Sequence, residues 1–311
     1  AYVTREPLGV VLVIGAWNYP LQLCLAPLIG AVAGGNCAVV KPSELAPATS
    51  RLLAGELPRY IDADAIFVVE GGGDQSAALL HHRFDHIFFT GSRRKGSDVM
   101  RAAADHLTPV TLELGGKCPC IVTDRADLRV AARRIVWGKF LNAGQTCISP
   151  DYLLVHERVE ADLITHMREA LERFYGTDPK SSPDYARIID DRQFQRLSGY
   201  LAEGELVVGG IVEGPERYIS PTIIRKVQPS SAIMREEVFG PLLPVITFAS
   251  LADAAGIVRA GEEPLAVYLF SRDPQELRFI REKTLSGGIC CNDLLFHASV
   301  SGLPFGGRGM S

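Results

Sequence analysis

Val10-Val11-Leu12-Val13-Ile14 is a short apolar run of branched residues, and similar runs recur along the first third of the chain. The others lie at Cys37–Val40, Ala65–Val69, His86–Phe89 and Val110–Leu112. Their starts are about 25 residues apart, which suits strand-helix-strand units. Parallel strands need such crossovers, and the helices then cover both faces of the sheet. The pattern therefore predicts a doubly wound α/β fold.

Segments with helical patterning separate these runs. Pro20–Ala33 can form a helix that opens with proline and closes at Gly34-Gly35, and Pro47–Tyr60 can form another, with Ser43 as a candidate cap. We expect residues 1–113 to form a dinucleotide-binding domain with an incomplete N-terminus.

The pattern changes after Cys147. A run at Tyr152–Val155, a charged helix at Glu157–Tyr175 and a polar stretch at 177–184 come first. Further strands are expected near Thr222 and at Leu243–Phe248, Ala266–Phe270 and Gly288–Cys291. We therefore predict a second α/β domain over residues 114–311, which carries Cys147, with the boundary just after Glu113.

Composition excludes several classes of protein. The chain has 311 residues, 47% of them hydrophobic, and a net charge of −4, so it can bury a core and lacks the basic excess of a nucleic-acid binder. Its seven irregularly spaced cysteines indicate reduced thiols in a cytoplasmic protein, without a metal site. The uncharged stretch 7–40 contains prolines and polar residues that divide it, so no membrane anchor is predicted.

Two segments carry the chemistry. Phe140-Leu141-Asn142-Ala143-Gly144-Gln145-Thr146-Cys147 ends in a thiol among small and polar residues, and Leu112-Glu113-Leu114-Gly115-Gly116-Lys117 supplies a carboxylate. A thiolate attacks carbonyl carbon, and a carboxylate can activate water. Both segments resemble those of the aldehyde dehydrogenase superfamily. The resemblance implies that Cys147 is the nucleophile and Glu113 the general base.

Other motifs extend the resemblance in the family's order. Ala16-Trp17-Asn18-Tyr19-Pro20 resembles its Pro-Trp-Asn-Tyr-Pro segment, which implies that Asn18 stabilises an oxyanion together with the backbone amide of Cys147. Lys41-Pro42-Ser43-Glu44 resembles a segment whose Lys and Glu bind the adenosine ribose. In Glu236-Glu237-Val238-Phe239-Gly240-Pro241, the second Glu corresponds to a ligand of the nicotinamide ribose, and Phe bounds the nicotinamide.

The resemblance implies an NAD or NADP site with these cofactor-binding residues: Trp17, Lys41, Glu44, Gly91, Ser92, Gly96, Leu114, Glu237 and Phe239. Phe89-Thr90-Gly91-Ser92 resembles a turn whose following helix faces the pyrophosphate with its amides. The family has Thr and an apolar residue where Arg93 and Lys95 stand here. Their positive charge could attract a 2′-phosphate, so we hypothesise that NADP is used.

Two stretches, Thr108–Leu112 and Tyr218–Thr222, look most like family 3 aldehyde dehydrogenases, and Leu303–Gly307 resembles the family's Pro-Phe-Gly-Gly segment. Family 3 oxidises medium to long aliphatic and aromatic aldehydes. The usual N-terminal helices and C-terminal tail are missing, so we expect a chain truncated at both ends. Family members are usually dimers or tetramers, but the pairing segment is among the missing parts.

The implied reaction converts an aldehyde to a carboxylic acid through a thiohemiacetal and a thioester on Cys147, and Glu113 then activates water. Two alternatives remain open. A CoA-acylating aldehyde dehydrogenase would transfer the acyl group to CoA, although that branch generally lacks this base. A truncated, catalytically silent protein would bind only a dinucleotide or a partner. The expected partner is a small aldehyde.

Overall fold

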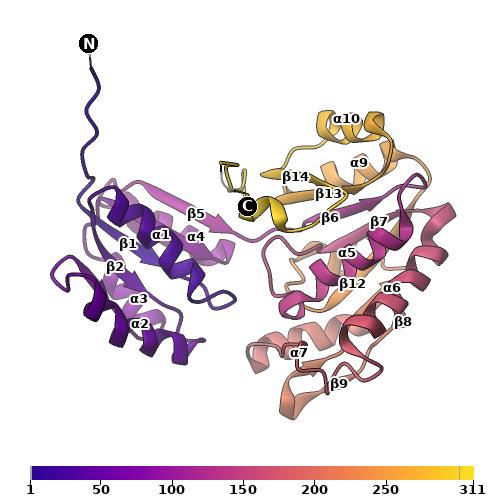
Figure 1. Cartoon of the computed structure of the whole chain (residues 1–311), viewed down its shortest axis with the longest axis horizontal. Helices are drawn as coiled ribbons and strands as arrows, with labels where there is room; N and C mark the ends of the chain where they lie inside the picture. Colours follow the sequence, from indigo (N-terminus) through magenta and orange to yellow (C-terminus); the bar gives the residue numbers. More distant parts are fainter. Residues whose placement is uncertain (1, 301) are drawn as a thin grey trace. The chain divides into compact units, whose positions relative to one another are not determined.

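The computed structural model describes residues 2–300 and 302–311. The chain divides into two compact units, residues 1–114 (unit 1) and 115–311 (unit 2), and each is described by itself (Figure 1). None of the helices in the described part of the chain is both long and apolar enough to cross a lipid bilayer.

Unit 1 contains a five-stranded sheet with the order β3-β2-β1-β4-β5. All of its pairings are parallel. Its elements in chain order are β1 (Val10–Ile14), α1 (Gln22–Ala33), β2 (Cys37–Lys41), α2 (Pro47–Tyr60), β3 (Ile66–Val68), α3 (Gly73–Leu80), β4 (His86–Gly91), α4 (Arg93–Ala104) and β5 (Val110–Leu114).

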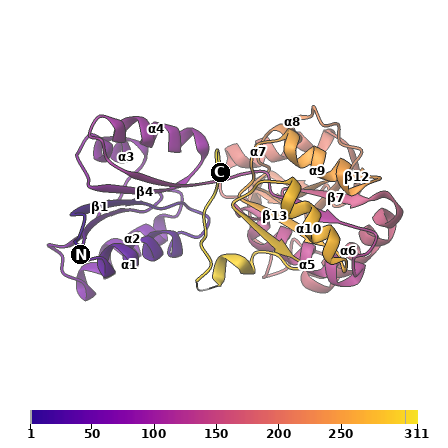
Figure 2. The same cartoon turned by 90° about the horizontal axis from the view of Figure 1, so that it is seen from above.

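The helices of unit 1 cover both faces of the sheet because its strands are apolar on both sides. Val11 and Val13 pack in one core with residues of α1 and α2, and Leu12 and Ile14 pack in another with residues of α3 and α4. Figure 2 shows the two helix pairs on opposite sides of the strands. The doubly wound α/β prediction is therefore confirmed.

The predicted helix starts need correction. The first helix begins at Gln22, because Pro20 lies in the preceding turn. The second helix begins at Pro47 as expected, but its N-cap is Ala46, and no side chain caps it. The hydroxyl of Ser43 instead accepts a hydrogen bond from the amide of Leu45 at 3.3 Å, so Ser43 stabilises the loop before the helix.

Unit 2 contains a seven-stranded sheet with the order β14-β13-β6-β7-β12-β11-β8. Only β8 is antiparallel to its neighbour among the pairings of this sheet within the described residues. The strands are β6 (Pro119–Val122), β7 (Tyr152–His156), β8 (Glu205–Val208), β11 (Thr222–Arg225), β12 (Leu242–Phe248), β13 (Ala266–Phe270) and β14 (Gly288–Cys291), and a separate hairpin pairs β9 (Val212–Glu213) with β10 (Tyr218–Ile219).

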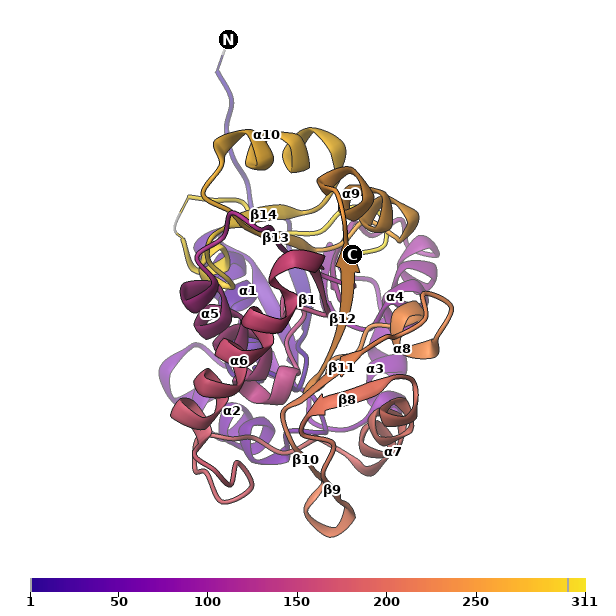
Figure 3. The same cartoon turned by 90° about the vertical axis from the view of Figure 1, so that its right-hand side faces the viewer.

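Helices also cover both faces of this second sheet (Figure 3). They are α5 (Leu128–Phe140), α6 (Glu160–Tyr175), α7 (Asp191–Gly199), α8 (Ala232–Arg235), α9 (Leu251–Ala260) and α10 (Pro274–Lys283). Along β7, Leu153 and Val155 pack in the core that contains α5 and α6, whereas Leu154 packs with residues of α9 and α10. The predicted charged helix starts with a short 3-10 turn at Glu157–Val159, and the α-helix follows from Glu160.

Candidate active site

The candidate residues of unit 1 lie along one edge of its sheet. Lys41 is the last residue of β2, Gly91 the last of β4, and Glu113 the penultimate residue of β5. Trp17 and Asn18 follow β1. Because all five strands are parallel, these positions share the carboxyl edge. Ligands of open α/β sheets bind at this edge, where the strand order reverses between neighbouring strands such as β1 and β4.

The turn after β4 has the predicted form. Ser92 is the N-cap residue of α4 in extended conformation, so the first amides of the helix point toward the carboxyl edge. A Cβ atom built on Gly96 would lie 2.7 Å from Cδ2 of Leu114. Gly96 therefore lets α4 pack closely on β5, a packing role that accompanies its proposed place in the cofactor site.

Lys41 is a buried charge at this edge, with 1% of its surface exposed. Its ammonium donates to the carbonyl of Pro42 at 2.7 Å and lies 4.0 Å from Oε2 of Glu44. Burial lowers the pKa of Lys41, and the carboxylate of Glu44 partly offsets that effect. Lys41 and Glu44, predicted to bind the same ribose, are thus neighbours in the structure.

Glu113 is a buried carboxyl group whose pKa is shifted by its surroundings. Burial raises the pKa of its carboxyl group from 4.5 to about 7. Its Oε2 is a buried atom without a hydrogen-bond partner in the described residues, and so is Oγ1 of Thr90. Thr90 and Glu113 are paired across β4 and β5. Unpaired buried polar atoms are costly, so this pair fits a site that a polar ligand or water completes.

In unit 2, the thiol is carried by a loop at the amino edge of the sheet. After α5, a turn at Leu141–Gly144 leads to Cys147, and β7 begins at Tyr152. Three successive residues of the turn are left-handed: φ is 52° at Asn142, 51° at Ala143 and 73° at Gly144. Non-glycine residues are strained there, so neighbouring contacts must hold the loop in place.

Gln145 supplies many of those contacts. Its side-chain amide donates to the carbonyls of Asn142 at 3.0 Å and Arg187 at 3.1 Å, and its Oε1 accepts from the amide of Ile189 at 3.0 Å. Gln145 is 3% exposed, so these bonds are shielded from water. The sequence motif contains Gln145, but this anchoring role was not predicted from it.

The buried wall behind Cys147 also fixes its backbone. The thiol of Cys118 donates to the carbonyl of Cys147 at 3.5 Å, and the hydroxyl of Tyr268 donates to the carbonyl of Ile148 at 2.6 Å. Burial raises the pKa of Cys118, which therefore stays a neutral thiol. Cys147 itself is only partly buried.

The loop that carries Glu237 and Phe239 precedes β12 and lies against the Cys147 loop. A Cβ atom on Gly144 would be 2.2 Å from the carbonyl oxygen of Gly240, so the two backbones touch. The carboxylate of Asp151 accepts from the amide of Val238 at 2.7 Å. The structure therefore brings the segments of Cys147, Glu237 and Phe239 together.

Lys117 completes this buried network. Its ammonium donates to Asp151 and, at 2.8 Å each, to the carbonyls of Ile233 and Glu236. A Cβ atom on Gly115 would lie 2.0 Å from Oε2 of Glu237, so the carboxylate of Glu237 occupies the space beside this glycine. Sequence reasoning did not assign site roles to Lys117 or Asp151, and only the position of Lys117 inside a recognised motif pointed to it.

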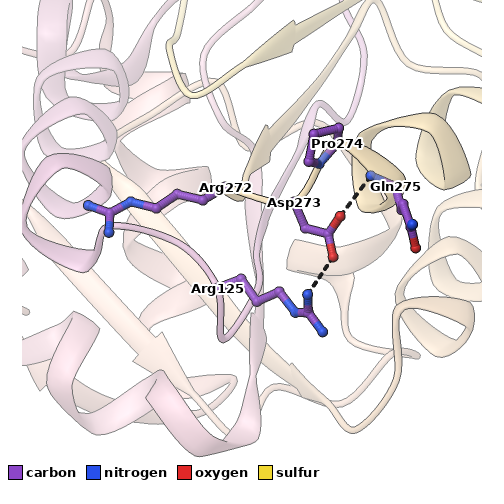
Figure 4. Close-up of a pocket in the computed structure, with 5 residues that line it drawn as sticks. All are labelled: Arg125, Arg272, Asp273, Pro274 and Gln275. Carbon is purple, nitrogen blue, oxygen red and sulfur yellow. Dashed lines mark hydrogen bonds and ion pairs between the residues drawn. The ribbon is translucent and has the colours of Figure 1, made fainter.

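The pocket drawn in Figure 4 lies elsewhere in unit 2. It has a volume of about 480 Å³ and is lined by Arg125, Arg272, Asp273, Pro274 and Gln275. These residues follow the carboxyl ends of β6 and β13, whereas Cys147 precedes the amino end of β7. Since β6, β7 and β13 are parallel, the pocket and the thiol loop lie at opposite edges of the sheet.

Comparisons with known proteins show which family the chain belongs to. The model of the aldehyde dehydrogenase family matches residues 1–311. The chain belongs to the aldehyde dehydrogenase family. It is 48% identical to rat aldehyde dehydrogenase family 3 member B1 over 311 residues, covering all of this chain and 66% of that protein. It is also 48% identical to the rat aldehyde dehydrogenase described as dimeric and NADP-preferring, of which it covers 68%.

A solved structure of a family member has the same fold. The substrate-bound state of Staphylococcus aureus AldH superposes with a TM-score of 0.96 at 46% identity, covering 98% of this chain and 67% of that one. The resemblance to family 3 is therefore borne out by the curated relatives. The chain spans about two thirds of their length.

Proposed function

We propose that the protein oxidises aldehydes to carboxylic acids with NAD⁺ or NADP⁺. The observation that carries the proposal is the contact between the loop of Cys147 and the loop of Glu237 and Phe239. This contact between the two loops supports a nucleophile at Cys147 that acts near the residues assigned to the nicotinamide half of the cofactor. Family membership supports the same reaction.

In the first half of the reaction, the thiolate of Cys147 attacks the aldehyde carbon. The side-chain amide of Asn18 and the backbone amide of Cys147 would donate to the developing oxyanion, and one such donor is worth about 3 kcal/mol of barrier. The bound oxidised nicotinamide supplies a hydride acceptor. Lys41 and Glu44 would hold the adenosine ribose, the amides after Ser92 the pyrophosphate, and Glu237 the second ribose.

In the second half, Glu113 removes a proton from the water that attacks the thioester. A carboxylate with a pKa of about 7 suits this task, because it is substantially ionised near neutrality and is still basic enough to take a proton. Hydrolysis returns Cys147 to a thiol and releases the acid.

We further propose that the substrates are medium to long aliphatic or aromatic aldehydes. Trp137, in the last turn of α5, stacks on Phe296 with ring centroids 5.3 Å apart and planes 9° apart. Leu141, one turn further along the chain, and Phe296 are both exposed. These apolar side chains belong to the same unit as the Cys147 loop, and an apolar lining would favour hydrocarbon chains or rings. The charges of Arg93 and Lys95 support use of NADP⁺.

The test uses the full-length protein with hexanal and benzaldehyde, with and without CoA, and measures NADH or NADPH. We expect oxidation without CoA, none in Cys147→Ala, and in Glu113→Gln a single burst followed by a stalled acyl-enzyme. Normal turnover in Cys147→Ala would refute the mechanism. Strict dependence on CoA would favour the acylating alternative, and cofactor binding without turnover would favour the silent one.

A further inference from the structure

The side chain of Arg196, on α7, donates hydrogen bonds to the main chain just before Phe239. Its Nη1 donates to the carbonyl of Glu237 at 3.1 Å, and its Nη2 donates to the carbonyl of Val238 at 2.7 Å. These two carbonyls belong to the residues that immediately precede Phe239. The guanidinium fork matches two adjacent acceptors in a way that a single ammonium group cannot.

The guanidinium is itself fixed in orientation. Its Nε donates to Oε1 of Gln193 at 2.8 Å, one turn earlier on the same helix. Its Nη1 also donates to the hydroxyl of Tyr200 at 3.2 Å, and the Tyr200 hydroxyl donates to Oε2 of Glu236 at 2.9 Å. Arg196 and Tyr200 therefore hold the segment Glu236–Val238 through both its backbone and a side chain.

This segment needs such support because Phe239 is strained. Its φ of 45° is left-handed, which costs an aromatic residue roughly 1–2 kcal/mol. Strained residues persist where the surrounding structure fixes them, and they often accompany function. Arg196 donates to the carbonyl of Val238, the residue before Phe239, and the carboxylate of Asp151 accepts from the amide of the same residue.

We propose that Arg196 is a positioning residue that keeps Glu237 and Phe239 in the conformation that binds the nicotinamide half of the cofactor. This inference rests on the proposed function, which assigns Glu237 and Phe239 to that half. Arg196 acts through the backbone, and its own bonds are to the protein. Without Arg196, a smaller fraction of the protein molecules would have this loop in the conformation that binds the cofactor. The apparent dissociation constant equals the intrinsic constant divided by that fraction, so it would rise.

The test compares the whole cofactor with its adenosine half. Calorimetry on the full-length protein measures the dissociation constants of NAD⁺ and ADP, or of NADP⁺ and 2′-phospho-ADP where wild type prefers NADP⁺. For Arg196→Met we expect the cofactor constant to rise about tenfold and that of the adenosine half to stay within about twofold. Arg196→Lys should recover part of the affinity, because it keeps the charge but loses the fork.

Arg192→Met is the matched control, since Arg192 lies on the same helix and is exposed. It should leave both constants unchanged. Hydrogen exchange without cofactor gives a second measurement: Arg196→Met should speed exchange at residues 236–240. Should Arg196→Met fail to fold, Arg196→Lys and Tyr200→Phe decide the matter, each with a smaller loss of the same kind.

Equal weakening of cofactor and adenosine half, or no weakening in any of these variants, would overturn the inference. Failure of the proposed function has a different signature. In that case the wild-type protein itself would bind no cofactor or oxidise no aldehyde, before any change at Arg196 is made.

Discussion

Glu113→Gln should stabilise unit 1 at high pH, because the native carboxylate is held in an unfavourable place. The pKa of Glu113 rises from 4.5 to about 7 through burial. The native state therefore binds more protons than the unfolded state between these values, and stability falls as the pH rises through that window. Each pKa unit corresponds to about 1.36 kcal/mol, so a rise of about 2.5 units sets the full cost above pH 7 at no more than about 3.4 kcal/mol.

Glutamine is nearly isosteric with glutamate and carries no charge, so the variant escapes this cost. We expect Glu113→Gln to exceed wild type in unfolding free energy by about 2–3 kcal/mol above pH 7, with the difference shrinking toward zero near pH 4.

The two tryptophans make the assay specific, since Trp17 belongs to unit 1 and Trp137 to unit 2. In a Trp137→Phe background, fluorescence during urea unfolding reports on unit 1 through Trp17. Urea titrations at a series of pH values are run with and without Glu113→Gln. A difference between the two proteins that stays constant from acid to alkaline pH would refute the reasoning, because it would mean that the carboxyl group titrates normally.

Further predictions concern the thiol loop and the cofactor site. Gly144→Ala would bring a methyl group to 2.2 Å from the carbonyl of Gly240 at a φ of 73°, so alkylation of the thiol by iodoacetamide should change markedly; an unchanged rate would contradict this. Gln145→Ala removes three buried hydrogen bonds and should cost about 2–3 kcal/mol in urea unfolding; a loss below about 0.5 kcal/mol would count against the anchor. Arg93→Thr with Lys95→Val should lower the NADP⁺ to NAD⁺ affinity ratio about tenfold in calorimetry, and an unchanged ratio would exclude a 2′-phosphate contact.

The strands of unit 1 were predictable because each is a compact apolar run between helices. Their ends were less so. The predicted runs stop at Phe89 and Leu112, whereas β4 continues to Gly91 and β5 to Leu114. Thr90 pairs with Glu113 and Gly91 with Leu114, so each strand extends the other. That mutual extension depends on tertiary pairing, which local hydrophobicity does not reveal.

In unit 2 the sequence was harder to interpret. The strand Pro119–Val122 was missed because it is short and starts with proline, although the first position of a strand tolerates proline well. The sequence also did not predict most of the contacts that surround the Cys147 loop. Gln145 reaches Arg187 and Ile189, and Arg196 reaches Glu237 and Val238, through main-chain groups about 40 residues away. A hydrogen bond to a backbone atom does not require a particular side chain in the partner residue, so no sequence motif marks it.

The side-chain bonds of Gln145 to Arg187 and Ile189 have a consequence for protein engineering. They connect the Cys147 loop to residues just beyond the polar surface stretch 177–184, which a designer would choose first for inserting a tag or shortening a loop. A change of length there would shift Arg187 and Ile189, and through their bonds to Gln145 it would displace the loop that carries the Cys147 sulfur. Libraries that vary the Cys147 loop should therefore keep this distant stretch at its native length.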